Sequence, residues 1–149
     1  TTEELVADFR RNAWKDCWMF PGALDMLRRL RLRGHKLGII TNGSEESQSA
    51  KLRGSGLDRL VDVALISERE RIRKPDPRIF ARATASLGVR TEECVFVGDN
   101  PETDIAGALG AGMKAIWVQG PLPWPENMTS VPTHTISSLT KLLTLEISE

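Results

Sequence analysis

Four short apolar segments alternate along the chain with longer segments in which apolar residues recur every three or four positions. The short segments are residues 37–40, 63–66, 94–97 and 115–118. Each is apolar at successive positions and lies between turn-forming residues, a pattern typical of strands buried on both faces of a parallel sheet. A shorter strand is expected at residues 134–136, near the end of the sequence.

The intervening segments have the periodicity and the end signals of helices. Ser44 and Asp76 are predicted N-caps, because their side-chain oxygens can accept hydrogen bonds from the free N–H groups of a first helical turn. Strands that alternate with helices predict an α/β fold, a doubly wound parallel sheet with right-handed crossovers. The helices are expected at residues 3–12, 23–33, 44–54, 77–87, 102–110 and 139–145.

The length of the chain and its balance of charge limit how many domains it can form and which partners it can bind. The 149 residues fit a single domain, and 20 Lys and Arg residues balance 20 Asp and Glu residues. No charge of one sign dominates, so neither nucleic acid nor an anionic membrane surface is favoured as a partner. No apolar stretch approaches the roughly 20 residues that span a bilayer, and no secretory signal opens the sequence. We therefore expect a cytoplasmic protein, with Cys94 as a reduced thiol in the core.

Polar residues follow two of the predicted strands directly, where the carboxyl ends of a parallel sheet bind ligands. After residues 37–40, Thr41 offers a hydroxyl and Asn42 a backbone N–H to one oxyanion, and Gly43 allows close approach. An ordinary turn is an equally good explanation of these three residues taken alone. After residues 94–97, Asp99 lies at the strand end and Asp104 one turn into the next helix.

Two carboxylates at a strand end suit a hard cation. Mg²⁺ binds one or two carboxylates and completes its octahedron with water and phosphate oxygens. The alternative is that Asp99 and Asp104 merely cap the helix that follows. Lys74 precedes Pro75, which holds its backbone extended and presents the ammonium as a positioned charge, although a solvated surface lysine is the simpler interpretation. Asp76 is expected to cap a helix and to do nothing more.

The order of these motifs resembles that of the haloacid dehalogenase-like hydrolase superfamily. The matching features are a strand followed by Thr-Asn-Gly, then Lys-Pro-Asp-Pro, then a strand followed by Gly-Asp and a second aspartate. The resemblance implies a Mg²⁺-dependent phosphatase acting on a small phosphorylated metabolite through an aspartyl-phosphate. It implies that Thr41 and the Asn42 N–H bind the phosphoryl oxygens and that Lys74 neutralises charge. Asp99 would bind Mg²⁺, and Asp104 would support the metal through water or orient Lys74.

The family's first motif, Asp-x-Asp after an apolar strand, is absent from the sequence. Asp8 lies in a helical context, and Asp16 follows no apolar strand, so neither qualifies as the nucleophile. Residues 1–20 resemble the end of a helical cap domain, and residues 21–149 resemble an incomplete core. The resemblance implies that the first, central strand and most of the cap are absent. We expect the chain to be inactive alone and to be completed by an N-terminal segment or within a homo-oligomer.

Three alternatives remain open from the sequence. A non-catalytic binding or assembly domain would also lack the nucleophile. A haloacid dehalogenase shares the core motifs, but the resemblance implies that its chemistry needs no metal, which leaves Asp99 and Asp104 unexplained. A phosphomutase shares the same motifs and differs in its cap.

Overall fold

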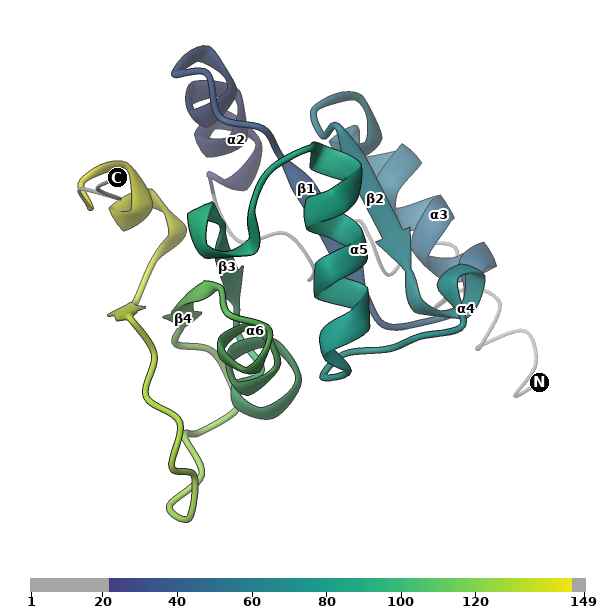
Figure 1. The fold of residues 1–149 in the computed structure, drawn as a ribbon. Helices are drawn as coiled ribbons and strands as arrows, with labels where there is room; N and C mark the ends of the chain where they lie inside the picture. Colours follow the sequence, from purple (N-terminus) through teal and green to yellow (C-terminus); the bar gives the residue numbers. More distant parts are fainter. Residues whose placement is uncertain (1–21, 146–149) are drawn as a thin grey trace, which may run out of the picture.

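In this computed structural model, which describes residues 22–145, five strands form two separate sheets (Figure 1). Every pairing between them is parallel. The first sheet consists of β1 (Gly38–Thr41) and β2 (Val63–Ile66). The second has the order β3 (Val95–Gly98), β4 (Lys114–Val118) and β5 (His134–Ile136). The predicted α/β fold with parallel strands is confirmed.

The helices begin and end close to the expected residues, because their end signals are local. Ser44 accepts a hydrogen bond from the Ser47 N–H, and Asp76 accepts one from the Arg78 N–H, so both predicted caps are confirmed. The α-helices are α2 (Ala23–Leu32), α3 (Glu45–Ser55), α4 (Ser67–Glu70), α5 (Pro77–Leu87) and α6 (Gly107–Gly110). Tighter or wider helical turns are η1 (Leu57–Arg59), η2 (Thr91–Glu93), η3 (Pro101–Ala106) and η4 (Leu139–Leu143).

Two of these turns differ in type from the expected helices. The segment expected as one α-helix at residues 102–110 begins as a π-helix, η3, and becomes α-helical only in α6. π-Helical turns are rare and occur often at functional sites. The last expected helix is a 3₁₀-helix, η4, rather than an α-helix.

The register places the carboxyl ends of the paired strands together. Thr41 lies beside Ile66, and Gly98 lies beside Trp117. The arrows of β1, β2 and β3 all point toward the lower part of Figure 1. Loops that leave these strand ends therefore meet on one side of the molecule.

The largest core cluster joins the two sheets through α5. Ile79 and Phe80 of α5 are fully buried and share this cluster with Ile40 of β1 and Ala115 of β4. Phe80 also makes an edge contact with Phe96 of β3, with ring centroids 5.2 Å apart. The buried apolar stripe of α5 thus fixes the two sheets relative to each other on this face.

The expectation of fully buried strands is wrong for residues 94–97. It holds only in part for residues 37–40 and 63–66, where Gly38 is exposed and Ile39, Val63 and Ala64 are half-buried. All four residues of β3 are half-buried. The physical reason is that β3 pairs only with β4, and β1 only with β2, within the described residues. One edge of β1 and one edge of β3 consequently have no strand partner in residues 22–145.

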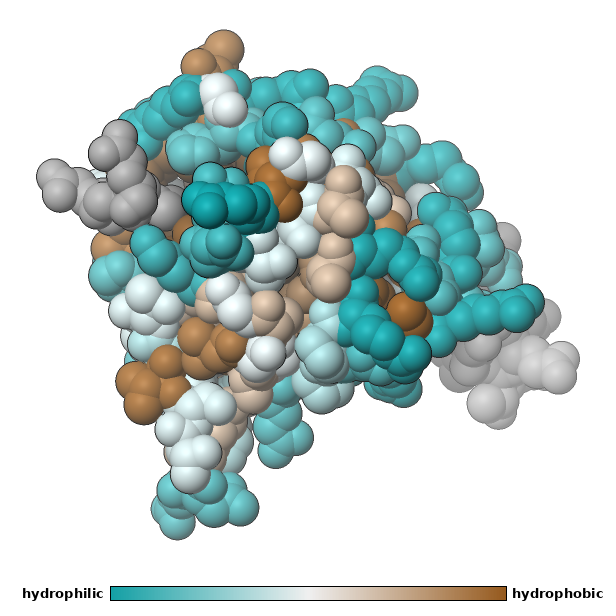
Figure 2. Space-filling view, viewed as in Figure 1, coloured by the Kyte–Doolittle hydropathy of each residue, from teal (hydrophilic) through white to brown (hydrophobic). Residues whose placement is uncertain are grey.

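The face drawn in Figure 2 is mostly hydrophilic, and its apolar residues form small separate groups, one of them beside the loop between β4 and β5. Leu122 and Val131 of that loop are exposed. None of the helices within residues 22–145 is long and apolar enough to cross a membrane. The free thiol of Cys94 is half-buried, and burial raises its pKa. The expected helix at residues 3–12, Asp8, Asp16, and Cys17 lie outside the described residues.

Candidate phosphate-binding and metal-binding site

Lys74 is a buried side chain rather than a solvated surface lysine. It is 9% exposed, and its ammonium donates a hydrogen bond to Asp104 Oδ1 at 2.6 Å. The same ammonium lies 5.4 Å from the centroid of the Phe96 ring, so a cation–π contact supports its position. These contacts hold one positive charge at the carboxyl ends of the strands.

The side chain of Asn42 fixes the backbone of Lys74. Asn42 Nδ2 donates to the Lys74 carbonyl oxygen at 3.0 Å, and the Lys74 N–H donates to Asn42 Oδ1 at 2.9 Å. From the sequence, only a backbone N–H of Asn42 was expected in the site, and that phosphate-binding role stays a prediction. The structure adds a side-chain role, which ties the end of β1 to the segment before α5.

Asp104 uses both of its carboxylate oxygens within the protein. Oδ1 accepts from Lys74, and Oδ2 accepts from the backbone N–H of Asn100 at 3.1 Å. Its position requires a glycine at residue 98, because a Cβ there would lie 2.5 Å from Asp104 Cβ and Oδ2. This geometry matches the second of the two roles expected for Asp104, the orientation of Lys74. Its role near a metal stays a prediction.

Asp99 does not cap the helix that follows it. Asn100 is the cap, since its Oδ1 accepts from the N–H groups of Glu102 and Thr103. The Asp99 carboxylate makes no hydrogen bond or ion pair within residues 22–145. Its backbone oxygen accepts a hydrogen bond from Trp117 Nε1 at 3.0 Å, which fixes the main chain of the strand end.

The donor chemistry at Asp99 fits Mg²⁺. Magnesium binds one or two protein carboxylates and takes its other ligands from water and phosphate oxygens. Asp99 supplies one such carboxylate at the strand end. No cluster of three or more His, Cys, Asp or Glu side chains that could hold a metal occurs in the described part of the chain. The remaining ligands would come from solvent, phosphate or groups outside residues 22–145.

Thr41 has a partner that the sequence did not reveal. Its hydroxyl donates to Gln48 Oε1 at 2.8 Å, across the first turn of α3. Gly43 has φ of 152°, a conformation that favours glycine, and its N–H donates to Ser67 Oγ at 3.0 Å. Gly43 lies against the Gln48 amide, where a Cβ would be only 2.6 Å from Nε2, and its N–H is not a free donor. Its phosphate-binding role stays a prediction. Gln48 lies one helical turn after the N-cap Ser44. A glutamine at this place in a helix is too common to be predicted as a functional residue from the sequence.

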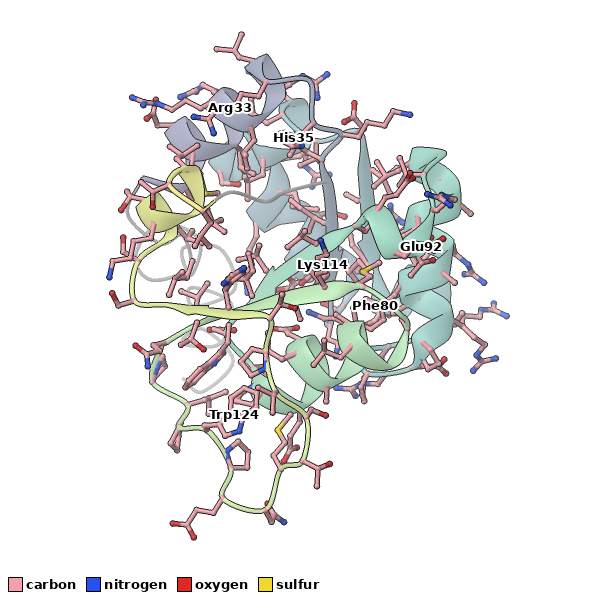
Figure 3. The ribbon with its side chains drawn as sticks, turned by 60° about the vertical axis from the view of Figure 1, so that its left-hand side comes forward. Arg33, His35, Phe80, Glu92, Lys114 and Trp124 are labelled. Atoms are coloured by element: carbon pink, nitrogen blue, oxygen red, sulfur yellow. The ribbon has the colours of Figure 1, made fainter. Side chains whose placement is uncertain are left out.

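The predicted site residues form one connected set at the strand ends. Thr41 precedes Asn42, Asn42 holds Lys74, Lys74 contacts Asp104, and Asp104 is bound to the residue after Asp99. Asp76 stands apart as a helix cap, and hydrogen bonds from the Arg78 side chain and backbone lower its pKa to about 2. Figure 3 shows Arg33 and His35 at the end of the molecule opposite Trp124. Trp124 packs edge-on against Trp117, the residue that binds the Asp99 backbone.

The chain is similar in sequence to known hydrolases over most of its length. The family model for haloacid dehalogenase-like hydrolases matches residues 3–112. The phosphoserine phosphatase of Thermus thermophilus is 39% identical over 128 residues, which are 86% of this chain and 51% of that protein. The (S)-2-haloacid dehalogenase 4A of Burkholderia cepacia is 34% identical over 137 residues, 92% of this chain and 59% of that protein. The chain spans only about half the length of these curated relatives.

Solved structures give the same fold. The crystal structure of a HAD phosphatase from Thermococcus onnurineus superposes with a TM-score of 0.79 at 32% identity. The match covers 97% of this chain and 63% of that one. The two sheets thus lie in the arrangement of a larger, related protein.

Proposed function

This chain belongs to the haloacid dehalogenase-like hydrolases, and on that premise we propose that it supplies the phosphate- and magnesium-binding part of a phosphate-monoester hydrolase. The substrate would be a small phosphorylated metabolite. One observation carries the proposal. The Lys74 ammonium, which is buried and paired with Asp104, lies at the same strand ends as the Asp99 carboxylate, which has no hydrogen-bond or ion-pair partner in the described residues.

The charges of this arrangement suit a phosphate ester. An anionic ester meets a carboxylate nucleophile only where cations offset the repulsion between them. Lys74 would provide one such charge, and Thr41 would donate a hydrogen bond to a phosphoryl oxygen. Mg²⁺ held by Asp99 would polarise the phosphoryl oxygens and neutralise the charge that develops during transfer.

The nucleophile has to come from outside the described residues. The unpaired edges of β1 and β3 would accept one more parallel strand, and an aspartate at its end would lie beside Thr41 and Asp99. In the family mechanism this carboxylate attacks phosphorus, the ester oxygen leaves as an alcohol, and water then hydrolyses the aspartyl-phosphate. We propose that the 149 residues alone do not turn over phosphate esters and that a segment carrying Asp-x-Asp completes the enzyme.

A haloacid dehalogenase is the second candidate, because the relatives include enzymes of that name. The uncommitted Asp99 carboxylate favours the phosphatase, since in this family dehalogenation needs no metal. In a non-catalytic domain, the buried ion pair of Lys74 and Asp104 would have no role in catalysis. A phosphomutase would differ only in parts outside the described residues.

Assays with p-nitrophenyl phosphate and with 2-chloropropionate separate these candidates. We expect a polypeptide that adds an upstream Asp-x-Asp segment to hydrolyse the phosphate ester only with Mg²⁺, and the 149-residue chain alone to be inactive. Asp99→Asn in the longer polypeptide should lower turnover at limiting Mg²⁺, whereas Asp25→Asn, on the exposed face of α2, should not. Halide release without metal would identify a dehalogenase, and turnover by the short chain equal to that of the longer one would contradict the proposal.

A further inference from the structure

We propose that Gln48 sets the direction of the Thr41 hydroxyl proton and thereby controls how tightly the site holds a phosphoryl group. This inference rests on the proposed function, in which Thr41 binds phosphoryl oxygens. Gln48 would act as a positioning residue, because it acts through Thr41 rather than on the substrate.

The hydrogen bond between Thr41 and Gln48 occupies the single hydroxyl proton of Thr41. Thr41 Oγ1 donates to Gln48 Oε1 at 2.8 Å. A hydroxyl has one proton and two lone pairs, so a hydroxyl committed to Gln48 presents only lone pairs to an anion. Lone pairs repel phosphate oxygens. In this arrangement Thr41 cannot serve as the donor that the site requires.

A half-turn of the Gln48 amide would free the Thr41 hydroxyl proton for the anion. The two ends of a carboxamide are an acceptor and a donor of nearly the same size, and rotation about its last bond exchanges them. Nε2 would then donate to Thr41 Oγ1, and the Thr41 proton would point to the phosphoryl group. A hydrogen bond to a charged acceptor is stronger than one between neutral groups, so a bound anion favours this second arrangement.

The nitrogen end of the Gln48 amide lies against a residue without a side chain. The amide lies against Gly43, where a Cβ would be only 2.6 Å from Nε2 and 2.9 Å from Cγ. The side chain is half-buried, and its Nε2 group makes no hydrogen bond within the described residues. No polar contact is therefore broken at Nε2 when the amide rotates, and residue 43 has no Cβ to clash with the amide.

A purely structural role is the competing explanation. The hydrogen bond from Thr41 to Gln48 joins the end of β1 to the first turn of α3, which would stabilise the fold without affecting anion binding. The two explanations differ in one respect. If Gln48 acts through the Thr41 proton, its effect on anion affinity disappears once that proton is removed.

A double-mutant cycle on sulfate binding makes this comparison. Sulfate keeps its double charge over the working pH range and mimics a phosphoryl group. Affinity is measured by NMR titration of the longer polypeptide that carries the upstream Asp-x-Asp segment. The variants are wild type, Gln48→Met, Thr41→Val and the double variant, with Gln119→Met, at the exposed residue after β4, as the matched control. Met and Val preserve the shape of each side chain and remove its hydrogen-bonding groups. Urea unfolding of the same variants measures stability separately.

We expect Thr41→Val to weaken sulfate binding about tenfold, from the loss of a charge-assisted hydrogen bond. We expect Gln48→Met to weaken it about threefold, because the Nε2 donor that would direct the Thr41 proton to the anion is lost. Gln48→Met should have no further effect in the Thr41→Val background, and Gln119→Met should bind as wild type does. An unchanged affinity in Gln48→Met, or an equal loss in both backgrounds, overturns the inference and leaves the proposed function intact. A wild-type chain that binds no sulfate, or a Thr41→Val variant that binds like wild type, contradicts the proposed phosphate site itself.

Discussion

Asn42 and Lys74 are 32 residues apart in sequence and are joined by two hydrogen bonds between the Asn42 side chain and the Lys74 backbone. The amide donates from Nδ2 and accepts at Oδ1, so both of its ends are satisfied by one residue. The pair positions the main chain of Lys74, while Asp104 positions its ammonium. Lys74 is thus fixed at both ends, as a charge that acts on a bound phosphate must be.

Replacement of Asn42 should loosen Lys74. Asn42→Ala leaves the half-buried N–H and C=O of Lys74 without their partner, and we expect a loss of about 1–3 kcal/mol in the free energy of unfolding. Asn42→Asp keeps the acceptor but places a carboxylate against the Lys74 carbonyl, so it should not restore stability. Urea unfolding of the two variants tests this.

The matched control is Asn127→Ala, at an exposed residue of the loop between β4 and β5. It should change the free energy of unfolding by less than about 0.5 kcal/mol. If Asn42→Ala and Asn127→Ala are equally stable, the side chain of Asn42 does not hold Lys74 in solution.

The buried ion pair of Lys74 and Asp104 should be sensitive to removal of one partner. Lys74→Met leaves a carboxylate that is 8% exposed without its counter-charge, and we expect a loss of about 3–5 kcal/mol. The double variant with Asp104→Leu should recover part of that loss, because no unpaired charge then remains. Chemical unfolding of the single and double variants measures the coupling.

The surface pair of Arg69 and Glu45, at 3.0 Å, serves as the comparison. Both side chains are about half exposed, so a cycle on this pair should give a coupling below about 1 kcal/mol. Equal couplings for the two pairs would mean that Lys74 and Asp104 are solvated, contrary to the structure.

Gly98 is expected to be intolerant of any side chain. A Cβ at this position would lie 2.5 Å from Asp104 Oδ2 and 2.6 Å from its Cγ, so Gly98→Ala must move Asp104 away from Lys74. We expect a loss of about 1–3 kcal/mol from this overpacking. A methyl group added at Gly110, at the end of α6, would meet no atom of another element within 4 Å, so Gly110→Ala should be neutral or stabilising. Thermal unfolding that ranks the two variants in the opposite order would contradict this packing.

The Asp76 cap should give a stability contribution that depends on pH. Hydrogen bonds from Arg78 lower the Asp76 pKa to about 2, below its ordinary value of 3.8. A carboxyl group with a lowered folded-state pKa stabilises the protein above pH 3.8, and the contribution is lost as the pH falls toward 2. The advantage of wild type over Asp76→Asn should therefore shrink between about pH 4 and pH 2. A difference in unfolding free energy that stays constant over this range would show that the interaction does not persist in solution.

Features set by neighbouring residues could be predicted from the sequence. The strands, most helix ends and the caps at Ser44 and Asp76 depend on local periodicity and on side chains within one turn. The gathering of Thr41, Lys74 and Asp99 at one set of strand ends follows from the parallel order of the strands. These parts of the prediction agree with the structure because the underlying rules act over short distances.

Other features depend on contacts that no local pattern encodes. Asp99 and Asn100 are adjacent polar residues, and either could have been the cap of η3. Asn100 is the cap in the structure, and its own N–H is held by Asp104 Oδ2. Asp104 is in turn held by Lys74, which is 30 residues away in sequence. The side chains of Gln48 and Asn42 acquire their partners only when β1, α3 and the segment before α5 meet. The half-exposed β3 likewise follows from its missing neighbour and not from its apolar sequence.

A shared phosphate and magnesium site at these strand ends can be located by anomalous scattering from crystals of the protein grown with tungstate and Mn²⁺. Tungstate replaces phosphate, and Mn²⁺ replaces Mg²⁺ with similar oxygen ligands. We expect a tungsten peak beside Thr41 and Lys74, with tungstate oxygens within hydrogen-bonding distance of Thr41 Oγ1 and Lys74 Nζ. We expect a manganese peak bound to the Asp99 carboxylate. Tungsten and manganese peaks that lie away from these strand ends would show that the protein does not hold phosphate and metal as proposed.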